Sequence, residues 1–414
     1  MCGIAGLIDL AGVDDAAASR LDAALERLSR RGPDGSGRWR DRFCVLGHTR
    51  LAIIDLSPAG AQPMIGHGFA VTQNGEIYNY RALRDELRAR GHAFATGSDT
   101  EVLLAGWREW GEGLLPRLVG MFAFALWTPE SGELVLVRDR FGKKPLLYRT
   151  EGTRLAFASD LLALERLWGA SFPLDPEAVR LLFALRYVPE PWSIASDVRK
   201  VPAGHIARFS RRGFELRPWY ELPRGQARRF RDEGEAAEEL RTRLDRAVLD
   251  RTVADVPVGA FLSGGLDSSI IVSSLARQTS SVRTFTVGFP GASGYYEERP
   301  AARALARHLG TDHNEIEIEA NDAREALDGV IDGLDEPFAD SSALPAFLLS
   351  KATRRHVRVA LSGDGADELF GGYRKHLGEL YAERYRRLPA WLRRGVIEPA
   401  ARRLPEGKDS LILE

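Results

Sequence analysis

The loop SGGLDSS at residues 263–269 carries the strongest chemical signal in the sequence. It follows an apolar run that is typical of a buried strand and precedes a run that is typical of a helix. Gly264 and Gly265 let backbone N–H groups approach a ligand closely, and the start of a helix adds partial positive charge. Hydroxyl donors come from three serines, Ser263, Ser268 and Ser269. This combination predicts a cradle for an oxyanion such as pyrophosphate.

Asp267 adds a negative charge to this cradle. A carboxylate would repel a phosphate unless a divalent cation lay between them, so Asp267 is a candidate Mg²⁺ ligand. The spacing GxxxxGK[ST] is absent, which argues against an NTPase that transfers the γ-phosphate in the usual way. A helix N-cap with a tight turn is the alternative interpretation, but the loop supplies more polar groups than a cap needs.

A second loop of the same kind lies in VALSGDGADELFGGY, residues 359–373. Asp364, Asp367 and Glu368 follow its Ser-Gly within a few positions, and such carboxylates repel one another unless a cation neutralises them. Ligands of parallel sheets bind at the carboxyl ends of strands, where both loops are expected. We therefore expect a Mg²⁺ ion shared between Asp267 and Asp367. For Glu368 alone, a solvated acidic turn is a sufficient explanation.

The sequence has two cysteines, and one of them directly follows the initiator methionine. Cys2 is either a small apolar residue of the first strand or a nucleophile, and the residue pattern alone leaves both interpretations open. Cys44, in RFCVLGH, fits a core position and receives no functional role. Two cysteines cannot build a disulfide framework, so we expect a reducing, cytoplasmic setting.

Length and charge limit the function classes. The 414 residues suffice for roughly two to three domains. Fifty-seven basic and 58 acidic residues give a net charge of −1, which argues against nucleic acid or an anionic membrane as the main partner. No apolar run approaches the ~18 residues of a membrane span, and no signal peptide is evident. The basic stretch 382–403 is interpreted as a solvated amphipathic helix.

The secondary-structure signals change in character along the chain. Up to about residue 210, short strands such as FCVLGHTRLAIID at 43–55 predominate, with a helix expected over 101–118. This pattern predicts stacked antiparallel sheets flanked by helices. Residues 219–236 are charged and interrupted by Gly and Pro, as in a linker. Beyond them, strands and helices alternate, which predicts a doubly wound parallel sheet.

Together these stretches resemble the glutamine-dependent asparagine synthetase family of class B. The matching stretches, in family order, are MCGIAG, RRGPDG, HTRLAIID, NGEIYNY, GSDTE, GMFAFALW, RDRFGKKPL, PVGAFLSGGLDSS, TFTVGF and LSGDGADELFGGY. The resemblance implies a class II glutamine amidotransferase domain at 2–215 with an Ntn-hydrolase αββα sandwich. It further implies a linker at 216–235 and a PP-loop ATP pyrophosphatase domain of adenine nucleotide α-hydrolase type at 236–414.

The resemblance also implies a role for Cys2. Met1 would be removed, and Cys2 would then carry both a thiol and a free α-amine. An α-amine titrates near ~7.7–8.0, so it can act as the general base that activates the thiol. The thiolate would attack the glutamine side-chain amide and release ammonia, leaving a γ-glutamyl thioester.

The remaining glutaminase residues are implied by their motifs. Arg50 is similar to the residue that binds the glutamine α-carboxylate, since a guanidinium suits that task. Glu76 and Asp99 resemble the partners of the α-ammonium group. The Asn74 side chain and the Gly75 N–H resemble an oxyanion hole. Taken alone, NGE would be interpreted as a hairpin turn and Arg50 as a surface charge.

In the second half, the resemblance implies an ATP site. Leu262 and Val287 would contact adenine or ribose through their backbone atoms, Ser362 and Gly363 would complete the nucleotide site, and residues 263–269 would hold pyrophosphate. The implied cofactors are ATP as substrate and Mg²⁺. The implied reaction is adenylation of aspartate followed by attack of ammonia that arrives through an internal tunnel. A homodimer is also a family expectation.

Two features qualify the resemblance. Some family members carry Glu where this chain has Asp364, so the contact of this residue with the acyl-AMP can differ. Family members also continue past residue 414, and their further helices bring a lysine to the acyl-AMP; neither Lys351 nor Lys375 matches it. We therefore expect either a fragment or an incomplete synthetase half, with exposed apolar surface where those helices would pack. The alternatives are a relative that amidates a glycan or peptide carboxylate, and a chain that acts only as a glutaminase or binding subunit.

Overall fold

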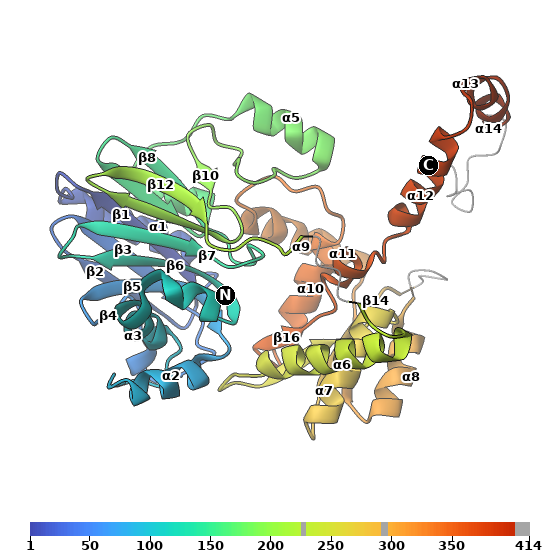
Figure 1. The fold of residues 1–414 in the computed structure, drawn as a ribbon, viewed down its shortest axis with the longest axis horizontal. Helices are drawn as coiled ribbons and strands as arrows, with labels where there is room; N and C mark the ends of the chain where they lie inside the picture. The colour runs from blue at the N-terminus through green and yellow to red at the C-terminus, as the bar shows by residue number, and fades with distance from the viewer. Residues whose placement is uncertain (225–228, 291–296, 402–414) are drawn as a thin grey trace.

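A computed structural model describes residues 1–224, 229–290 and 297–401 of the chain. Two six-stranded antiparallel sheets form the N-terminal part, and a four-stranded parallel sheet forms the C-terminal part (Figure 1). This arrangement confirms the expected architecture, an αββα sandwich of two antiparallel sheets followed by a parallel α/β unit.

The N-terminal part consists of two stacked sheets. The first has the order β10-β8-β9-β1-β3-β2, with β1 (Gly3–Asp9), β2 (Gly35–Arg40), β3 (Cys44–Arg50), β8 (Leu147–Glu151), β9 (Arg154–Ala158) and β10 (Arg199–Lys200). The second has the order β12-β11-β7-β6-β5-β4, with β4 (Met64–Gly66), β5 (Phe69–Ile77), β6 (Gly120–Thr128), β7 (Glu133–Arg138), β11 (His205–Ser210) and β12 (Gly213–Pro218).

Strict alternation of side chains builds the layers of this part. In β1, Ile4 and Ile8 face the other sheet, whereas Leu7 faces the helices α1 (Ala16–Leu28) and α4 (Leu161–Trp168). The second sheet is covered on its outer face by α2 (Tyr80–Ala89) and α3 (Thr100–Trp110). Cys44 is fully buried between the two sheets, as its apolar context predicted.

The C-terminal part begins with α6 (Glu233–Asp250). Its sheet has the order β15-β14-β13-β16, and all pairings are parallel; the strands are β13 (Val258–Phe261), β14 (Arg283–Gly288), β15 (Asp312–Glu317) and β16 (Val359–Leu361). The connecting helices are α7 (Leu266–Gln278), α8 (Arg299–Leu309), α9 (Ala320–Gly333) and α10 (Ala343–Thr353). The chain proceeds outward from β13 to β15 and returns to the other side of β13 as β16. The topological switch point, where such sheets bind ligands, therefore lies between β13 and β16.

Two expected elements end earlier than the sequence suggested. The strand expected over 43–55 stops at Arg50, because the chain turns there and Asp55 takes a left-handed conformation with φ 52°. The helix expected over 101–118 ends at Trp110, because Gly111 has φ 54°, and a 3₁₀ helix, η2 (Gly111–Arg117), follows.

The final described segment projects away from the body of the molecule (Figure 1). It follows α11 (Ala366–Phe370), which lies at the body, and comprises α12 (Arg374–Arg386), α13 (Ala390–Leu392), the π-helical turn η4 (Arg393–Ile397) and α14 (Glu398–Ala401). The single solvated helix expected over 382–403 is instead broken at Pro389, whose ring cannot continue α12; its last two positions lie outside the described residues.

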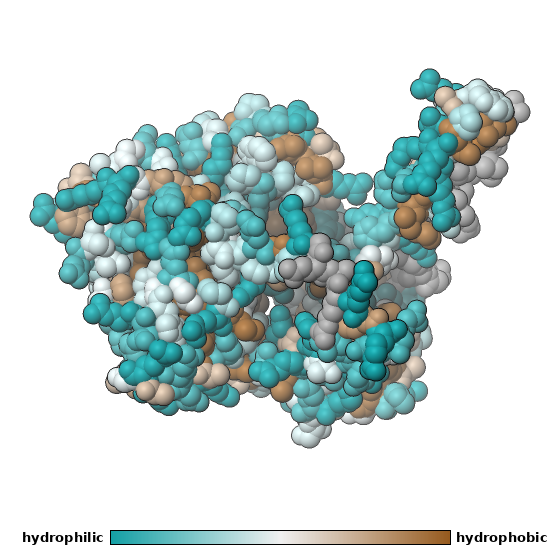
Figure 2. All heavy atoms as spheres, viewed as in Figure 1, coloured by the Kyte–Doolittle hydropathy of each residue, from teal (hydrophilic) through white to brown (hydrophobic). Residues whose placement is uncertain are grey.

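Large apolar side chains lie exposed on this projecting segment (Figure 2). They include Leu377, Leu380 and Trp391, and Leu369 and Phe370 of the preceding α11 are exposed as well. Within the described ranges, no helix combines the length and the apolar character that crossing a bilayer requires.

Candidate active sites

Cys2 lies at the start of β1, where its thiol faces the chain just after β3. Its Sγ is 3.4 Å from the Leu51 N atom and 3.7 Å from the Leu51 carbonyl oxygen. Burial raises the pKa of the thiol. Burial and the nearby cations Arg31, Lys144 and Arg354 lower the pKa of the Met1 α-amine to about 5. The thiol therefore stays protonated, and the neighbouring amine stays neutral, at neutral pH.

Asn74 and Gly75 lie side by side near the end of β5. The Asn74 side chain is fully buried, and neither its Nδ2 nor its Oδ1 has a hydrogen-bond partner. A buried unpartnered amide is rare in folded proteins because it carries the full cost of desolvation. The position predicted as an oxyanion-hole donor thus holds a free donor, which is the property that the role requires.

Gly75 has no room for a side chain. Its φ is 149°, and a Cβ atom there would lie 2.1 Å from the Met121 carbonyl oxygen of β6. We expect Gly75→Ala to force β5 and β6 apart and to lower the free energy of unfolding by roughly 2–4 kcal/mol, as urea denaturation would measure. The matched control is Gly68→Ala, because Gly68 has φ 91° but open space around it; it should cost only about 1 kcal/mol. Equal losses in the two variants would contradict the packing argument.

Glu76, which is half-buried, and Asp99, which is buried, form a pair of acids near Cys2. Asp99 precedes α3 and accepts hydrogen bonds from the Ile77 N–H at 2.8 Å and from Gln73 Nε2 at 3.4 Å. Burial raises the pKa of both carboxyl groups, and the charge of Asp99 raises that of Glu76 further. Two carboxylates in this position are suited to bind a cationic group.

The Glu76 charge should weaken the fold of the ligand-free protein. Folding raises the pKa of Glu76. The free energy of unfolding therefore falls as the pH rises from the ordinary pKa of a carboxyl group to the raised pKa of the folded state, because the folded protein must then hold a charged Glu76. Glu76→Gln should therefore increase the free energy of unfolding at neutral pH by about 1 kcal/mol, and the gain should vanish at about pH 4. Urea denaturation at both pH values measures this. A destabilised Gln variant at neutral pH would contradict it.

Arg50 ends β3 and binds the backbone of the turn that follows. Its guanidinium donates to the Ser57 carbonyl at 2.8 Å, to the Ile54 carbonyl at 3.4 Å, and to the Asp55 carbonyl. The structure therefore shows Arg50 organising residues 54–57. Its predicted contact with a substrate carboxylate stays a prediction.

Two cations of this site were not assigned a role from the sequence. Lys144 is buried, its Nζ lies 3.1 Å from Met1 Sδ, and its charge interacts with Glu76 and Cys2. Arg31 Nε donates to the Cys2 carbonyl at 3.1 Å, and its Nη2 is buried without a partner. Lys144 lies in the stretch RDRFGKKPL and Arg31 in RRGPDG, both of which match the family. Their charge inside a matching stretch was the signal that could have assigned them to the site.

Residues 263–269, the first of the two loops that the sequence predicts to bind nucleotide, connect β13 to α7; we call this the first nucleotide loop and residues 362–368 the second. Ser263 Oγ and Ser268 Oγ lie 2.8 Å apart, and the Gly265 N–H donates to Ser263 Oγ at 3.1 Å. Ser269 Oγ donates to the Gly265 carbonyl at 2.6 Å. The serines thus hold the loop, while Gly264 and Gly265 leave its backbone exposed.

The second nucleotide loop packs directly against the first. A Cβ atom on Gly363 would lie 2.7 Å from the Ser268 N atom, and Leu361 pairs with Ala260 of β13. On the other side, the Leu262 N–H donates to the Phe285 carbonyl of β14, the strand that carries Val287. The structure therefore brings Leu262, Ser362 and Gly363 to one edge of the sheet, as predicted.

The acidic residues of the second loop have separate partners. Asp364 accepts a hydrogen bond from Ser362 Oγ at 2.8 Å, and Glu368 accepts one from the Tyr373 hydroxyl. For Asp367, the backbone carbonyl oxygen accepts hydrogen bonds from the Gly371 and Gly372 N–H groups. Within the described ranges, no three His, Cys, Asp or Glu side chains are grouped to hold a metal ion. A cation near Asp267 and Asp367 would need phosphate oxygens to complete its coordination.

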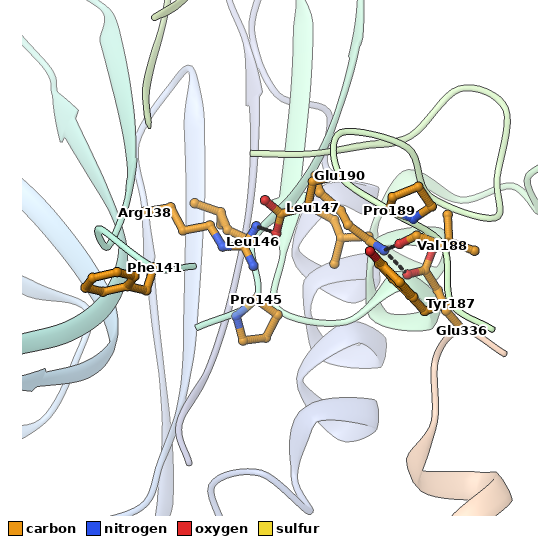
Figure 3. A pocket seen from close by; sticks show the side chains of 11 residues that line it. Arg138, Phe141, Pro145, Leu146, Leu147, Tyr187, Val188, Pro189, Glu190 and Glu336 are labelled. Carbon is orange, nitrogen blue, oxygen red and sulfur yellow. Dashed lines mark hydrogen bonds and ion pairs between the residues drawn. The ribbon is translucent and has the colours of Figure 1, made fainter. Parts of the chain in front are cut away.

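A cavity of about 670 Å³ lies between the two parts of the chain (Figure 3). Most of its lining comes from the N-terminal part, including Phe141 and Pro145, and Glu336 comes from the C-terminal part. Glu336 forms an ion pair with Lys200 at 2.5 Å. Neither Cys2 nor Lys144 lines this cavity, although Pro145 directly follows Lys144 in the chain.

Comparison with protein families divides the chain in the same way. Residues 1–220 match the family described as glutamine amidotransferase domain, and residues 239–412 match the family described as asparagine synthase. The residues around Cys2 lie in the first match, and both nucleotide loops lie in the second.

Curated relatives match along almost the whole chain. A Bacillus subtilis protein named asparagine synthetase (glutamine-hydrolyzing) 1 is 35% identical, over 98% of this chain and 64% of its own length. A Methanocaldococcus jannaschii protein named putative asparagine synthetase (glutamine-hydrolyzing) 2 is 35% identical, over 95% of this chain and 79% of its own length. A Mycobacterium tuberculosis relative with the corresponding name is 38% identical, and this chain spans 65% of that protein.

Proposed function

The chain belongs to the glutamine-hydrolysing asparagine synthetase family, and from this premise we propose that it converts aspartate to asparagine with glutamine as nitrogen donor and ATP as the activating substrate. Glutamate, AMP and pyrophosphate are the other products. The observation that supports the glutamine half best is the buried, unpartnered Asn74 amide in the residue next to Gly75. A ligand carbonyl would satisfy it.

Glutamine hydrolysis begins with the proton of the Cys2 thiol. Removal of Met1 places the α-amine on Cys2, in surroundings that lower the pKa of the Met1 amine to about 5 by burial. A neutral amine accepts the thiol proton, and the thiolate attacks the side-chain amide carbon of glutamine. Asn74 Nδ2 and the Gly75 N–H donate to the oxyanion. The amide nitrogen leaves with that proton as ammonia, and water then hydrolyses the thioester to glutamate.

Charged groups hold the other end of glutamine. Glu76 and Asp99 bind its α-ammonium group, and the cation lowers the cost of burying two carboxylates together. Arg50 binds the α-carboxylate through N–H groups that its carbonyl contacts leave free.

ATP binds at the switch point between β13 and β16. The backbone of Leu262 and Val287 contacts the adenosine part, and residues 263–269, with Ser362 and Gly363, bind the phosphates.

The aspartate side-chain carboxylate attacks the α-phosphorus, and pyrophosphate leaves. Ammonia then attacks the acyl carbon of the acyl-AMP, and AMP leaves with its bonding electrons. Mg²⁺, held by Asp267 and Asp367, would neutralise the phosphate charge. Asp364 would contact the acyl-AMP or the incoming ammonia.

An internal route would carry ammonia from the Cys2 site to the acyl-AMP. The ion pair of Lys200 with Glu336 beside the cavity shows that the two parts of the chain are in contact, as such a route requires. A closed route would keep ammonia from being protonated in bulk water. Homodimerisation and a cytoplasmic location stay predictions.

An assay of all products tests this function. The chain is incubated with glutamine, Mg-ATP and aspartate, and glutamate, AMP, pyrophosphate and asparagine are quantified together, after intact-mass measurement of Met1 removal. Asparagine and AMP in equal amounts support the proposal. Glutamate alone indicates a glutaminase with an idle ATP site. AMP formation only with a glycan or peptide carboxylate would overturn the choice of aspartate.

A further inference from the structure

Residues 51–55, the turn after β3, form one wall of the Cys2 site. The Leu51 backbone flanks Cys2 Sγ, and the Ile54 and Asp55 carbonyls bind the Arg50 guanidinium. The position of this turn therefore sets where the thiol and the guanidinium lie.

The C-terminal part holds the same turn from the opposite side. The Asp55 N–H donates to the Asp255 carboxylate at 2.7 Å, and the Asp255 N–H donates to the Ile53 carbonyl at 2.8 Å. Asp55 has φ 52°, a left-handed conformation that costs free energy in a non-glycine residue and persists only where the surroundings fix it. The hydrogen bonds of the Asp55 N–H to Asp255 and of the Asp55 carbonyl to Arg50 hold this conformation in place.

A second contact holds the start of the turn. Arg358 Nη1 donates to Asp34 Oδ2 at 2.6 Å, and the same oxygen accepts the Ala52 N–H at 2.9 Å. Val359, which follows Arg358, packs against the core that contains Ile53 and Ile54. The ion pair is only partly exposed, so solvent weakens it less than a surface pair.

We propose that Asp255 and Arg358, two residues of the C-terminal part, are positioning residues of the glutamine site. Asp255 acts through Asp55 on Arg50, and Arg358 acts through Asp34 and Ala52 on the Leu51 backbone beside Cys2. The inference rests on the proposed function of Cys2 and Arg50. Asp255 and Arg358 lie just before β13 and β16, the strands that carry the two nucleotide loops, so one pair of strands supports both sites.

The Asp255 arm of the proposal is tested by glutamine kinetics. Asp255→Ala removes the acceptor of the Asp55 N–H but keeps the backbone bond to Ile53. We expect the KM for glutamine to rise about tenfold with little change in kcat, because a hydrogen bond to a charged group is lost. Asp255→Asn, whose amide oxygen still accepts, should restore most of the KM. Ammonia-supported synthesis should not change in either variant.

The Arg358 arm is tested without glutamine turnover. Iodoacetamide alkylation of Cys2, followed by mass spectrometry across a pH series, reports how readily the thiol ionises. The Leu51 N–H lowers the pKa of the thiol, so Arg358→Ala should move the alkylation profile to higher pH and slow the reaction about threefold or more at neutral pH. Arg358→Lys should restore the profile, because lysine can still pair with Asp34. Cys44 is buried and should stay unmodified.

A third variant separates positioning from general loosening of the interface. Asp332 forms an exposed ion pair with Arg30 between the same two parts and has no hydrogen bond or ion pair with residues 51–55. Asp332→Ala should leave both the KM and the alkylation profile at wild-type values. The proposal is overturned if Asp255→Ala keeps the wild-type KM, if Arg358→Ala keeps the wild-type profile, or if Asp332→Ala changes either equally. If the wild type released no glutamate, the proposed function would fail. The alkylation series would still show whether Arg358 positions the Leu51 backbone beside Cys2.

Discussion

Replacement of Cys2 by alanine should lower glutamine-supported synthesis by about 10³-fold or more and leave ammonia-supported synthesis at the wild-type rate. The thiol is the only group at this position that can form the thioester, whereas ammonia can reach the acyl-AMP without it. Alanine is also tolerated structurally, because the Cys2 Sγ contacts with Leu51 are long at 3.4 and 3.7 Å. The two rates are measured as asparagine formed with glutamine or with an ammonium salt as donor.

The other cysteine provides the matched control. Cys44 is fully buried between the sheets, so Cys44→Ala should cost about 1 kcal/mol of stability and leave the use of glutamine intact. Persistent glutamate release by the Cys2 variant would show that another group is the nucleophile. A parallel loss of both nitrogen donors would instead indicate that Cys2 serves the fold.

The sequence predicted the nucleotide edge of the C-terminal sheet because that prediction depends on local signals and topology. Each loop has a strand before it and a helix start after it, and parallel strands with helical crossovers place their carboxyl ends at one edge. The structure confirms that the two loops meet, because β13 and β16 are neighbours and Gly363 lies against the backbone of Ser268, whereas nucleotide binding at this edge stays a prediction. No knowledge of distant contacts was needed.

The turn at 51–55 could not be predicted in the same way. The apolar residues of 51–54 favoured a strand through Asp55, but the Asp55 N–H finds its acceptor in Asp255, 200 positions later in the chain. A left-handed Asp is fixed here by tertiary contacts that override local propensity. Such contacts are invisible to any window of sequence.

Lys144 and Arg31 were missed for a related reason. A charged residue is ordinarily solvated, and only burial beside other charges gives it a role in a site. Lys144 is buried next to Met1, while Arg31 reaches the Cys2 carbonyl from 29 positions away. Their roles follow from packing between β1, the chain after α1 and the chain after β7, which the sequence pattern does not specify.

Replacement of Asp267 by asparagine should impair the half-reaction that the Cys2 variant spares: AMP formation should fall while glutamate release continues. Asn keeps the size of the side chain in the first turn of α7 but removes the charge that a divalent cation needs. We expect AMP and pyrophosphate formation to fall roughly 100-fold, with a higher Mg²⁺ requirement, because a phosphate-bound cation contributes several kcal/mol to the transition state. Glutamate release should continue, since Cys2 lies in the other part of the chain.

A variant at the other end of the same sheet controls for charge and stability. Asp312 begins β15, far along the strands from the nucleotide loops, and pairs with Arg283 at 3.6 Å. Asp312→Asn should leave AMP formation and its Mg²⁺ dependence unchanged. If Asp267→Asn formed AMP at the wild-type rate under limiting Mg²⁺, the cation would bind elsewhere. In that case the Ser and Gly backbone of residues 263–269 would hold pyrophosphate without an acidic ligand. The two variants at Cys2 and Asp267 thus test each half of the reaction while the other half serves as the internal reference.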